Sequence, residues 1–302
     1  MRVYVTGASG FVGAHVVREL RKRGAEVRDE FVELGDRPGL ERVVAGCDAV
    51  FHVAALYSFD APGRELQRVN VEGTRNVLDA CRAQGVARLV HTSTAATCGP
   101  VPGRVATEED SPPAWELSVP YKWTKLEAER LVLEAPIDAV VVNPTTPVGE
   151  GDRRPTPTGR MIRGVASGRY RAFLDIGLNV VDVRDVARGH LLALEHGRSG
   201  ERYILGGANL TLAELFAAVA DLAGRRRPRL RVPYAAVRAA AAVGLVNPNE
   251  ARLARLPAYF SSAKAERELG YRPGPVEPAL ARAVADLSAG GSGASESTGP
   301  ER

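Results

Sequence analysis

The sequence predicts an α/β fold with a doubly wound parallel sheet, and three observations support this prediction. Segments with strand-like and helix-like patterns alternate through the first half of the chain, which is the rhythm of a parallel sheet covered by helices. The apolar runs 49–53 and 139–142 lack alternation, as expected for strands buried on both faces. A glycine-rich segment also follows the first apolar run and precedes a helical pattern.

These patterns place the elements in order. Strands are expected at 3–6, 26–34, 49–53, 88–92 and 139–143, and helices at 15–23, 40–46, 72–84 and 121–133. Further on we expect a helix near 160–167, a strand-helix unit over 179–196 and a strand at 203–205. The predicted organisation is a first domain of residues 1–148, to which 178–207 return, and a smaller, mostly helical lobe of residues 149–177 and 208–287. The Ser/Gly/Glu-rich tail 288–302 is expected to be disordered.

Composition limits the possible classes of protein. The chain has 302 residues, 45% of them apolar, and a net charge of +4, so it can bury a large core. We interpret the basic run Arg225 to Arg231 as a solvated loop and expect no nucleic-acid partner. The three cysteines have no metal-type spacing, the histidines show no metal pattern, and no metal is expected. No leading signal segment and no apolar run of about 18 residues is present, which favours a cytoplasmic protein without a membrane partner.

The segment Gly7-Ala8-Ser9-Gly10-Phe11-Val12-Gly13 has the spacing of a dinucleotide-binding turn. Its glycines allow a tight turn and let the backbone approach a pyrophosphate, which then lies on the free N–H groups of the following helix. The motif therefore predicts a Rossmann-type fold and a site for NAD or NADP, with Gly7, Ser9, Gly10, Phe11, Val12 and Gly13 as cofactor-binding residues.

A second motif, Tyr121-Lys122-Trp123-Thr124-Lys125, places a phenol and an ammonium at i and i+4 on one helix face. A lysine near a tyrosine stabilises the phenolate, so we expect the pKa of Tyr121 to fall toward neutrality, where it can act as a general acid or base. Its partner should be a hydroxyl. Candidates lie in 91–96, directly after a predicted strand.

Together these residues resemble the extended short-chain dehydrogenase/reductase family, which holds NAD-dependent sugar epimerases and dehydratases and dihydroflavonol-reductase-like enzymes. The resemblance covers nearly the whole chain except the tail, and it is carried further by 47–55, 70–76, Asn143-Pro144 and 181–187. Segments 155–160, 201–207 and 260–265 look most like the hopanoid-associated sugar epimerase subgroup.

The resemblance implies roles for individual residues. Tyr121 would be the acid/base, Lys125 would bind the nicotinamide ribose, and Thr94 would be the catalytic hydroxyl, with Ser93 as the fallback. Both Ser93 and Thr94 would also contact substrate. Thr92, Ala54, Ala55, Asn143 and Pro144 would border the cofactor. Arg160 could meet an anionic group of the substrate. A homodimer through the helices at 72–84 and 121–133 is the default that the resemblance implies.

One interval departs from the family pattern. Only sixteen residues, 24–39, separate the first helix from the next, and two parallel neighbouring strands need a connection of about a dozen residues or more. We therefore expect one strand here and one strand-helix unit fewer than usual. The acidic residue that selects NAD normally lies about twenty residues after the last glycine. This count reaches Glu33, with Asp36 and Arg37 nearby, so the sequence does not decide between NAD and NADP. Because the interval is short, weak or absent cofactor binding is a further alternative.

Three functions follow from these residues. The leading hypothesis is an NAD(P)-dependent reductase or epimerase acting on a carbonyl or carbinol carbon of a small molecule, either a sugar nucleotide or a secondary metabolite. An alternative keeps Tyr121 and Lys125 for proton transfer alone, as a cofactor-independent lyase, isomerase or cyclase. A ligand-sensing or scaffold protein is the third, and it would not need Tyr121, Lys125 and Thr94 together.

Overall fold

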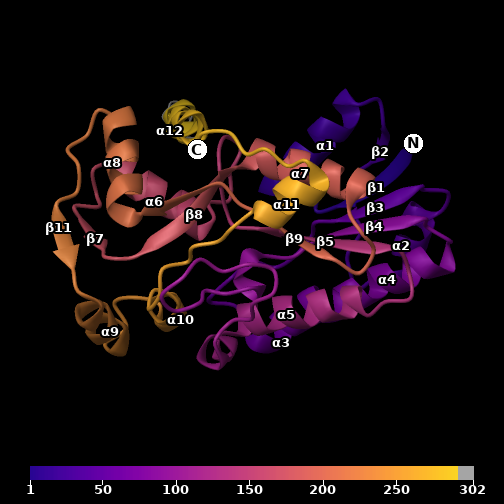
Figure 1. Cartoon of the computed structure of the whole chain (residues 1–302), viewed down its shortest axis with the longest axis horizontal. Coiled ribbons are helices and arrows are strands. Elements are labelled where there is room, and N and C mark those ends of the chain that lie inside the picture. Colours follow the sequence, from indigo (N-terminus) through magenta and orange to yellow (C-terminus); the bar gives the residue numbers. More distant parts are fainter. Residues whose placement is uncertain (292–302) are drawn as a thin grey trace, which may run out of the picture.

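The computed structural model describes residues 1–291, and its first lobe is built on a six-stranded sheet in which every pairing is parallel (Figure 1). The strand order is β2-β1-β3-β4-β5-β9. The strands are β1 (Arg2–Thr6), β2 (Glu26–Arg28), β3 (Ala49–His52), β4 (Arg88–Thr92), β5 (Ala139–Pro144) and β9 (Arg202–Leu205). All six residues of β5 are buried, which confirms the prediction of a strand covered on both faces.

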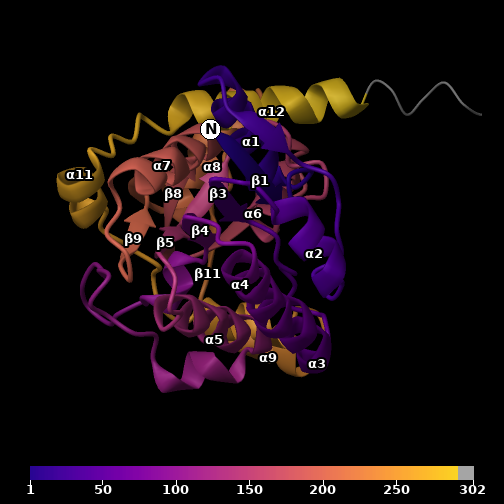
Figure 2. The ribbon, with the colours of Figure 1, turned by 90° about the vertical axis from the view of Figure 1, so that its right-hand side faces the viewer.

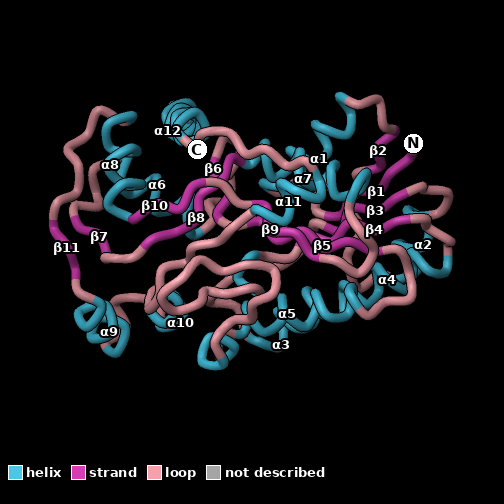
Figure 3. Tube along the Cα trace, viewed as in Figure 1, coloured by secondary structure: helices cyan, strands magenta, loops and turns pink. Residues whose placement is uncertain are grey.

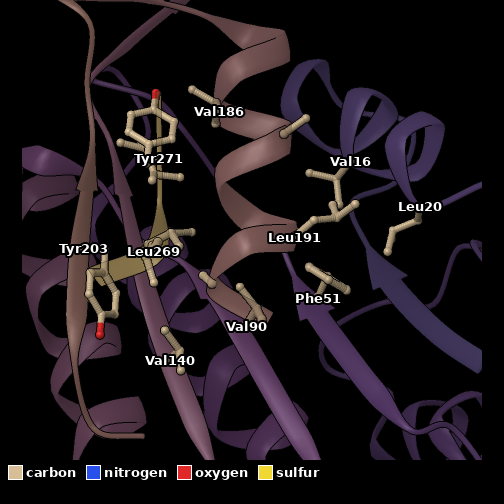
Figure 4. Close-up of a cluster of buried hydrophobic side chains, with 14 of the residues drawn as sticks. Val16, Leu20, Phe51, Val90, Val140, Val186, Leu191, Tyr203, Leu269 and Tyr271 are labelled. Atoms are coloured by element: carbon tan, nitrogen blue, oxygen red, sulfur yellow. The ribbon is translucent and has the colours of Figure 1, made fainter. Parts of the chain in front are cut away.

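Helices cover both faces of this sheet (Figure 2). One face carries α1 (Phe11–Lys22), α7 (Val183–His196) and α11 (Ala263–Leu269). The other carries α2 (Arg37–Val44), α4 (Gly73–Ala83) and α5 (Pro120–Leu133). Figure 4 shows the first of the two cores, with Val16 and Leu191 of neighbouring helices on one side of α7 and Tyr203, Leu269 and Tyr271 on the other. The doubly wound prediction is confirmed.

The short interval after α1 holds a single short strand. β2 pairs in parallel with β1 through only three residue pairs, from Arg2↔Glu26 to Tyr4↔Arg28, and forms the edge of the sheet. The chain then runs without regular structure from Asp29 to Asp36 and enters α2. The predicted absence of a second strand-helix unit is confirmed, and the strand is shorter than the expected 26–34.

The second lobe combines two small sheets with helices (Figure 3). The three-stranded sheet has the order β10-β8-β6 and the two-stranded sheet pairs β11 with β7. Its strands are β6 (Thr146–Val148), β7 (Ala172–Leu174), β8 (Gly177–Asp182), β10 (Ala208–Thr211) and β11 (Leu230–Val232). Its helices are α6 (Pro157–Ala166), α8 (Leu212–Leu222), α9 (Tyr234–Ala242), α10 (Pro248–Leu253) and α12 (Glu277–Gly291).

The lobe boundaries differ from the expected ones in three places. Strand β8 pairs with β6 and β10, so residues 178–182 lie in the small sheet and only α7 and β9 return to the first lobe. Helix α11 packs on α7 and β9 instead of remaining in the second lobe, because Ala265 and Leu269 bury their side chains there. Helix α12 continues to Gly291, so the predicted disordered tail does not begin at 288, and residues 292–302 lie outside the described residues.

Within residues 1–291, no helix combines the length and apolar character needed to cross a bilayer.

Candidate functional site

The turn between β1 and α1 can be built only with glycine at two positions. Gly7 has φ +67°, and a Cβ there would lie 2.8 Å from the backbone of Ala54. A Cβ on Gly13 would lie 2.1 Å from the carbonyl oxygen of Gly7. Gly10 is the N-cap of α1 and has no side chain to cap the helix, so the first N–H groups of α1 remain open to an anion.

A cavity of about 300 Å³ lies beside this turn, large enough for part of a dinucleotide. It brings together five of the predicted cofactor-binding residues, Gly7, Ser9, Ala54, Ala55 and Glu33. The rest of its lining is Tyr4, Ala8, Asp29, Glu30, Phe31, Val32, Leu34, Gly35, Leu56, Glu65, Arg68 and Val69. The glycine turn and the cavity together fit a bound dinucleotide, with its pyrophosphate on the N-terminus of α1.

The charges at this cavity are mostly negative. Asp29, Glu30, Glu33 and Glu65 line it, against the single cation Arg68. The guanidinium of Arg68 lies 3.2 Å from the carboxylate of Glu33, and both side chains are exposed. A 2′-phosphate placed here would meet more negative than positive charge.

Asp36 and Arg37, the other two candidates for cofactor selection, are engaged elsewhere. The Asp36 carboxylate is the N-cap of α2 and accepts a hydrogen bond from the N–H of Gly39 at 3.0 Å. Arg37 pairs with Glu41 at 3.0 Å and with Asp79 at 3.3 Å. Neither residue lines the cavity, so their contact with the cofactor stays a prediction, and Glu33 is the acidic candidate that does line it.

Lys125 joins helix α5 to the end of strand β4. Its ammonium donates a hydrogen bond to the carbonyl oxygen of Thr92 at 2.8 Å, and burial lowers its pKa to about 8. The Thr92 hydroxyl faces the other way, 2.8 Å from Nε2 of His190 on α7. The strand end and the helix face are therefore held together as the Tyr-Lys motif requires.

Tyr121 precedes Lys125 by one helical turn, but its environment differs from the expected one. Burial raises the pKa of its phenol instead of lowering it, and the nearby Tyr57 acts in the same direction. The expectation of a lowered pKa is therefore wrong for this structure. The physical reason is desolvation of the phenolate, while the Lys125 ammonium donates its hydrogen bond to the carbonyl oxygen of Thr92 instead of to the phenol.

Two aromatic rings that sequence reasoning missed surround Tyr121. The ring centroid of Tyr57 lies 4.7 Å from that of Tyr121, and the ring of Phe59 lies 5.7 Å away, edge on. Both come from the segment after β3, which Asn70 holds by accepting from the N–H of Leu56 at 2.8 Å. The sequence does place these two aromatic residues shortly after Ala54-Ala55 and the buried strand that precedes them, and this position near a predicted cofactor contact could have marked them as site residues.

The predicted hydroxyl, Thr94, lies above a buried polar network. Asn143 donates to the Thr94 carbonyl oxygen at 3.1 Å, to Thr97 at 3.0 Å and to Glu129 at 2.7 Å. Glu129 follows Lys125 by one turn of α5 and pairs with Arg202 at 2.7 Å. The network fixes the backbone that carries Thr94. Sequence reasoning named Asn143 but missed Glu129, although its i+4 spacing from Lys125 places it on the same helix face.

The remaining candidates are placed as follows. Ser93 is buried, and its hydroxyl has no hydrogen-bond partner among the described residues. Pro144 ends β5, and Val12 packs in the core below the glycine turn. Phe11 faces a small cavity shared with the second lobe. Arg160 pairs with Glu250 at 2.9 Å and so joins α6 to α10, with its cation already neutralised.

These features define a dinucleotide-binding fold with a Tyr-Lys pair at the end of strand β4. The model of the NAD dependent epimerase/dehydratase family matches residues 3–206, and the chain belongs to that family. It is an enzyme of the extended short-chain dehydrogenase/reductase type, with NAD or NADP as its cofactor.

Curated relatives span nearly the whole chain. A putative dihydroflavonol 4-reductase of Synechocystis is 36% identical over 93% of each chain. Sterol demethylase protein B of Methylococcus capsulatus is 34% identical over 94% of this chain and 98% of its own. A 3-beta-hydroxysteroid dehydrogenase of Mycolicibacterium neoaurum is 32% identical over 90% and 87%. Among solved structures, a dTDP-glucose 4,6-dehydratase of Streptomyces venezuelae with NAD bound has a TM-score of 0.79 at 25% identity, covering 95% of this chain and 97% of that one.

Proposed function

We propose that the protein is an NAD-dependent ketone reductase or alcohol dehydrogenase whose substrate is an apolar ring system, with Tyr121 as the proton donor and acceptor. The observation that carries the proposal is the aromatic wall around Tyr121, made by Tyr57 and Phe59. Such a wall suits a flat apolar ring better than a sugar hydroxyl cluster.

Two further observations favour an apolar substrate over a sugar nucleotide. The guanidinium of Arg160, the cation expected to meet a phosphate or carboxylate, is already paired with Glu250. The names of three relatives refer to a dihydroflavonol, a sterol and a hydroxysteroid, each of which is a fused ring system. The 25% identical sugar-nucleotide dehydratase shares the fold but is the more distant sequence.

The chain's own residues would divide the work as follows. A tyrosine phenol is protonated at neutral pH, so Tyr121 would hold the proton that a substrate carbonyl oxygen needs as its carbon is reduced. The Thr94 hydroxyl would hold the same oxygen. The Lys125 ammonium would bind the ribose next to Tyr121 and stabilise the phenolate that Tyr121 becomes when it gives up its proton. When bound, the nicotinamide would supply or accept the hydride. In the oxidative direction each transfer is reversed.

We propose NAD as the cofactor because of the charge at the cavity. Glu33, Asp29 and Glu30 would favour a ribose 2′-OH and disfavour a 2′-phosphate. Arg68, the one cation there, is paired with Glu33.

The proposal is tested by following NADH consumption with a polycyclic apolar ketone and, separately, with a nucleotide sugar. We expect turnover of the ketone alone, and a loss of about 10²-fold or more in Tyr121→Phe. Tyr170→Phe is the matched control, because Tyr170 is partly exposed in the second lobe. Full activity of Tyr121→Phe would contradict the proposed role. Turnover that proceeds equally without nucleotide would instead indicate the cofactor-independent lyase or isomerase.

A further inference from the structure

Residues 222–249 form an unusually basic segment of the second lobe. They contain six arginines, Arg225, Arg226, Arg227, Arg229, Arg231 and Arg238, and no Asp or Glu, whereas the whole chain has a net charge of only +4. The local excess is therefore larger than that of the entire protein. It includes the basic run that we expected from the sequence to be only a solvated loop.

The same segment exposes apolar side chains. Helix α9 contains no buried residue, although it is built from Ala, Val and Tyr with a single arginine. Leu230, Val243 and Leu245 are 66%, 72% and 79% exposed. Single exposed apolar residues are ordinary, but α9 has no fully buried side chain and is flanked by three such residues, so it buries little apolar surface against the rest of residues 1–291.

The fold gathers these residues at one end of the molecule. Strand β11 pairs with β7, and the N–H of Arg229 donates to the carbonyl oxygen of Arg171 at 3.3 Å. This contact brings Arg169 and Arg171 next to the basic segment. Figure 1 shows β11 and α9 together at the left-hand end, away from the six-stranded sheet. We call residues 222–245, with Arg169 and Arg171, the basic-apolar surface.

Most of these charges lack a counter-ion among residues 1–291. Arg227 pairs with Asp221, and Arg231 with Asp175. Over residues 1–291, no carboxylate lies within ion-pair distance of Arg169, Arg171, Arg225, Arg226, Arg229 or Arg238. Like charges held close together repel one another, and a negatively charged partner relieves that repulsion.

We propose that the basic-apolar surface docks the protein on an anionic lipid bilayer, from which it takes its apolar substrate. Arginines attract anionic headgroups while exposed Leu and Val side chains enter the interface, a combination that a nucleic acid would not use. The substrate part of this inference rests on the proposed function. It departs from the sequence-based expectation of no membrane partner, which rested on the lack of a spanning segment.

The position of the surface relative to Tyr121 supports this use. Helix α9 leads directly into Asn247 and Asn249, which bind the loop beside the site. Asn249 donates to the carbonyl oxygen of Phe59 at 2.9 Å, and Asn247 donates to Asp60. The ring of Phe59 is in turn in contact with Tyr121. A molecule leaving the bilayer beside α9 would therefore arrive next to the aromatic wall.

Co-sedimentation of the full chain with vesicles tests the proposal. We expect binding to vesicles of mixed phosphatidylglycerol and phosphatidylcholine, and little binding to phosphatidylcholine alone. The pair Arg226→Glu and Arg229→Glu should weaken binding at least tenfold, because each arginine near such a surface contributes about fivefold. The pair Val243→Ser and Leu245→Ser should weaken binding that persists at high salt. Arg42→Glu with Arg82→Glu, exposed on α2 and α4, is the matched control and should bind as the wild type does.

Failure to bind mixed vesicles, or equal binding by all variants, would overturn the proposal. The proposal would also be overturned if the same arginines bound duplex DNA while the protein did not bind vesicles. It would equally be overturned if the protein formed a dimer that only Val243→Ser with Leu245→Ser disrupted. Turnover of a water-soluble ketone without lipid separates this proposal from the proposed function. All surface variants should retain that turnover, whereas its loss in the wild type would count against the proposed reaction and not against docking.

Discussion

The ammonium of Lys125 lies 2.8 Å from the carbonyl oxygen of Thr92, so that one hydrogen bond ties helix α5 to the end of strand β4. The lysine is almost fully buried, and its charge is stabilised there by this carbonyl and by the nearby carboxylate of Glu129. The motif's lysine is therefore already in place beside the strand end that carries the predicted hydroxyl.

This environment predicts a pH dependence of stability. Burial lowers the pKa of Lys125 to about 8 from 10.5, so between these values the unfolded chain binds more protons than the folded one. The free energy of unfolding should therefore rise with pH from about 8 to 10, relative to Lys125→Met. Urea unfolding of both proteins across this range measures the difference. Parallel curves would show that the lysine is not desolvated.

Glu33 should determine the choice of cofactor. Replacing it by Gln removes one negative charge from the cavity and frees Arg68 from its 3.2 Å ion pair. We expect the affinity for NADP to rise about tenfold relative to NAD, as measured by calorimetry. Glu41→Gln removes a half-buried charge on α2, outside the cavity, and should leave the ratio unchanged. An unchanged ratio in Glu33→Gln would assign the selection to another residue.

Asp36, by contrast, should affect stability alone. Its side chain caps α2, and loss of such a cap costs about 1 kcal/mol. Asp36→Ala should lower the free energy of unfolding by this amount and leave nucleotide affinity unchanged. Chemical denaturation and nucleotide titration of the same sample check both parts. A marked loss of nucleotide affinity in Asp36→Ala would instead indicate that Asp36 contacts the cofactor.

Three buried histidines should make the protein sensitive to acid. Burial lowers the pKa of His52 to about 3, that of His190 to about 4, and that of His91 well below its usual range. Their contribution to stability is fully present above about pH 6.5 and is lost as the pH falls, because the unfolded chain takes up the protons first.

His91→Phe isolates one part of this effect. Both ring nitrogens of His91 lack a hydrogen-bond partner among the described residues, so replacement by an apolar ring should cost little at neutral pH or even stabilise. Below about pH 6 the loss of stability should be smaller by roughly 1.4 kcal/mol per pH unit than in the wild type. His196→Phe, at an exposed site, should not change the slope. An unchanged slope in His91→Phe would contradict this account.

Local sequence patterns predicted much of the fold and part of the site. Short-range geometry determines the buried valines of β5, the glycine turn and the Tyr-Lys pair, and it also determines the single strand in the sixteen-residue interval.

Other features depend on contacts between distant segments, which no local pattern carries. These are the positions of Tyr57 and Phe59 and the ion pair of Glu129 with Arg202. The pairing of β8 with β6 and β10 was not predicted for the same reason. The capping role of Asp36 was not predicted because it depends on the residue at which α2 begins. Dimerisation through α4 and α5 stays a prediction.

Calorimetric titration of the cofactor-stripped protein with NAD, NADH, NADP and NADPH measures whether the glycine turn binds a nicotinamide dinucleotide and which of the four it prefers. Gly10→Asp places a carboxylate at the N-terminus of α1, where the pyrophosphate would lie, and Gln84→Glu adds the same charge at the end of α4 as a control. We expect NAD and NADH to bind more tightly than the 2′-phosphorylated pair, Gly10→Asp to abolish binding, and Gln84→Glu to preserve it. Binding of none of the four nucleotides to a folded wild-type protein would contradict this expectation.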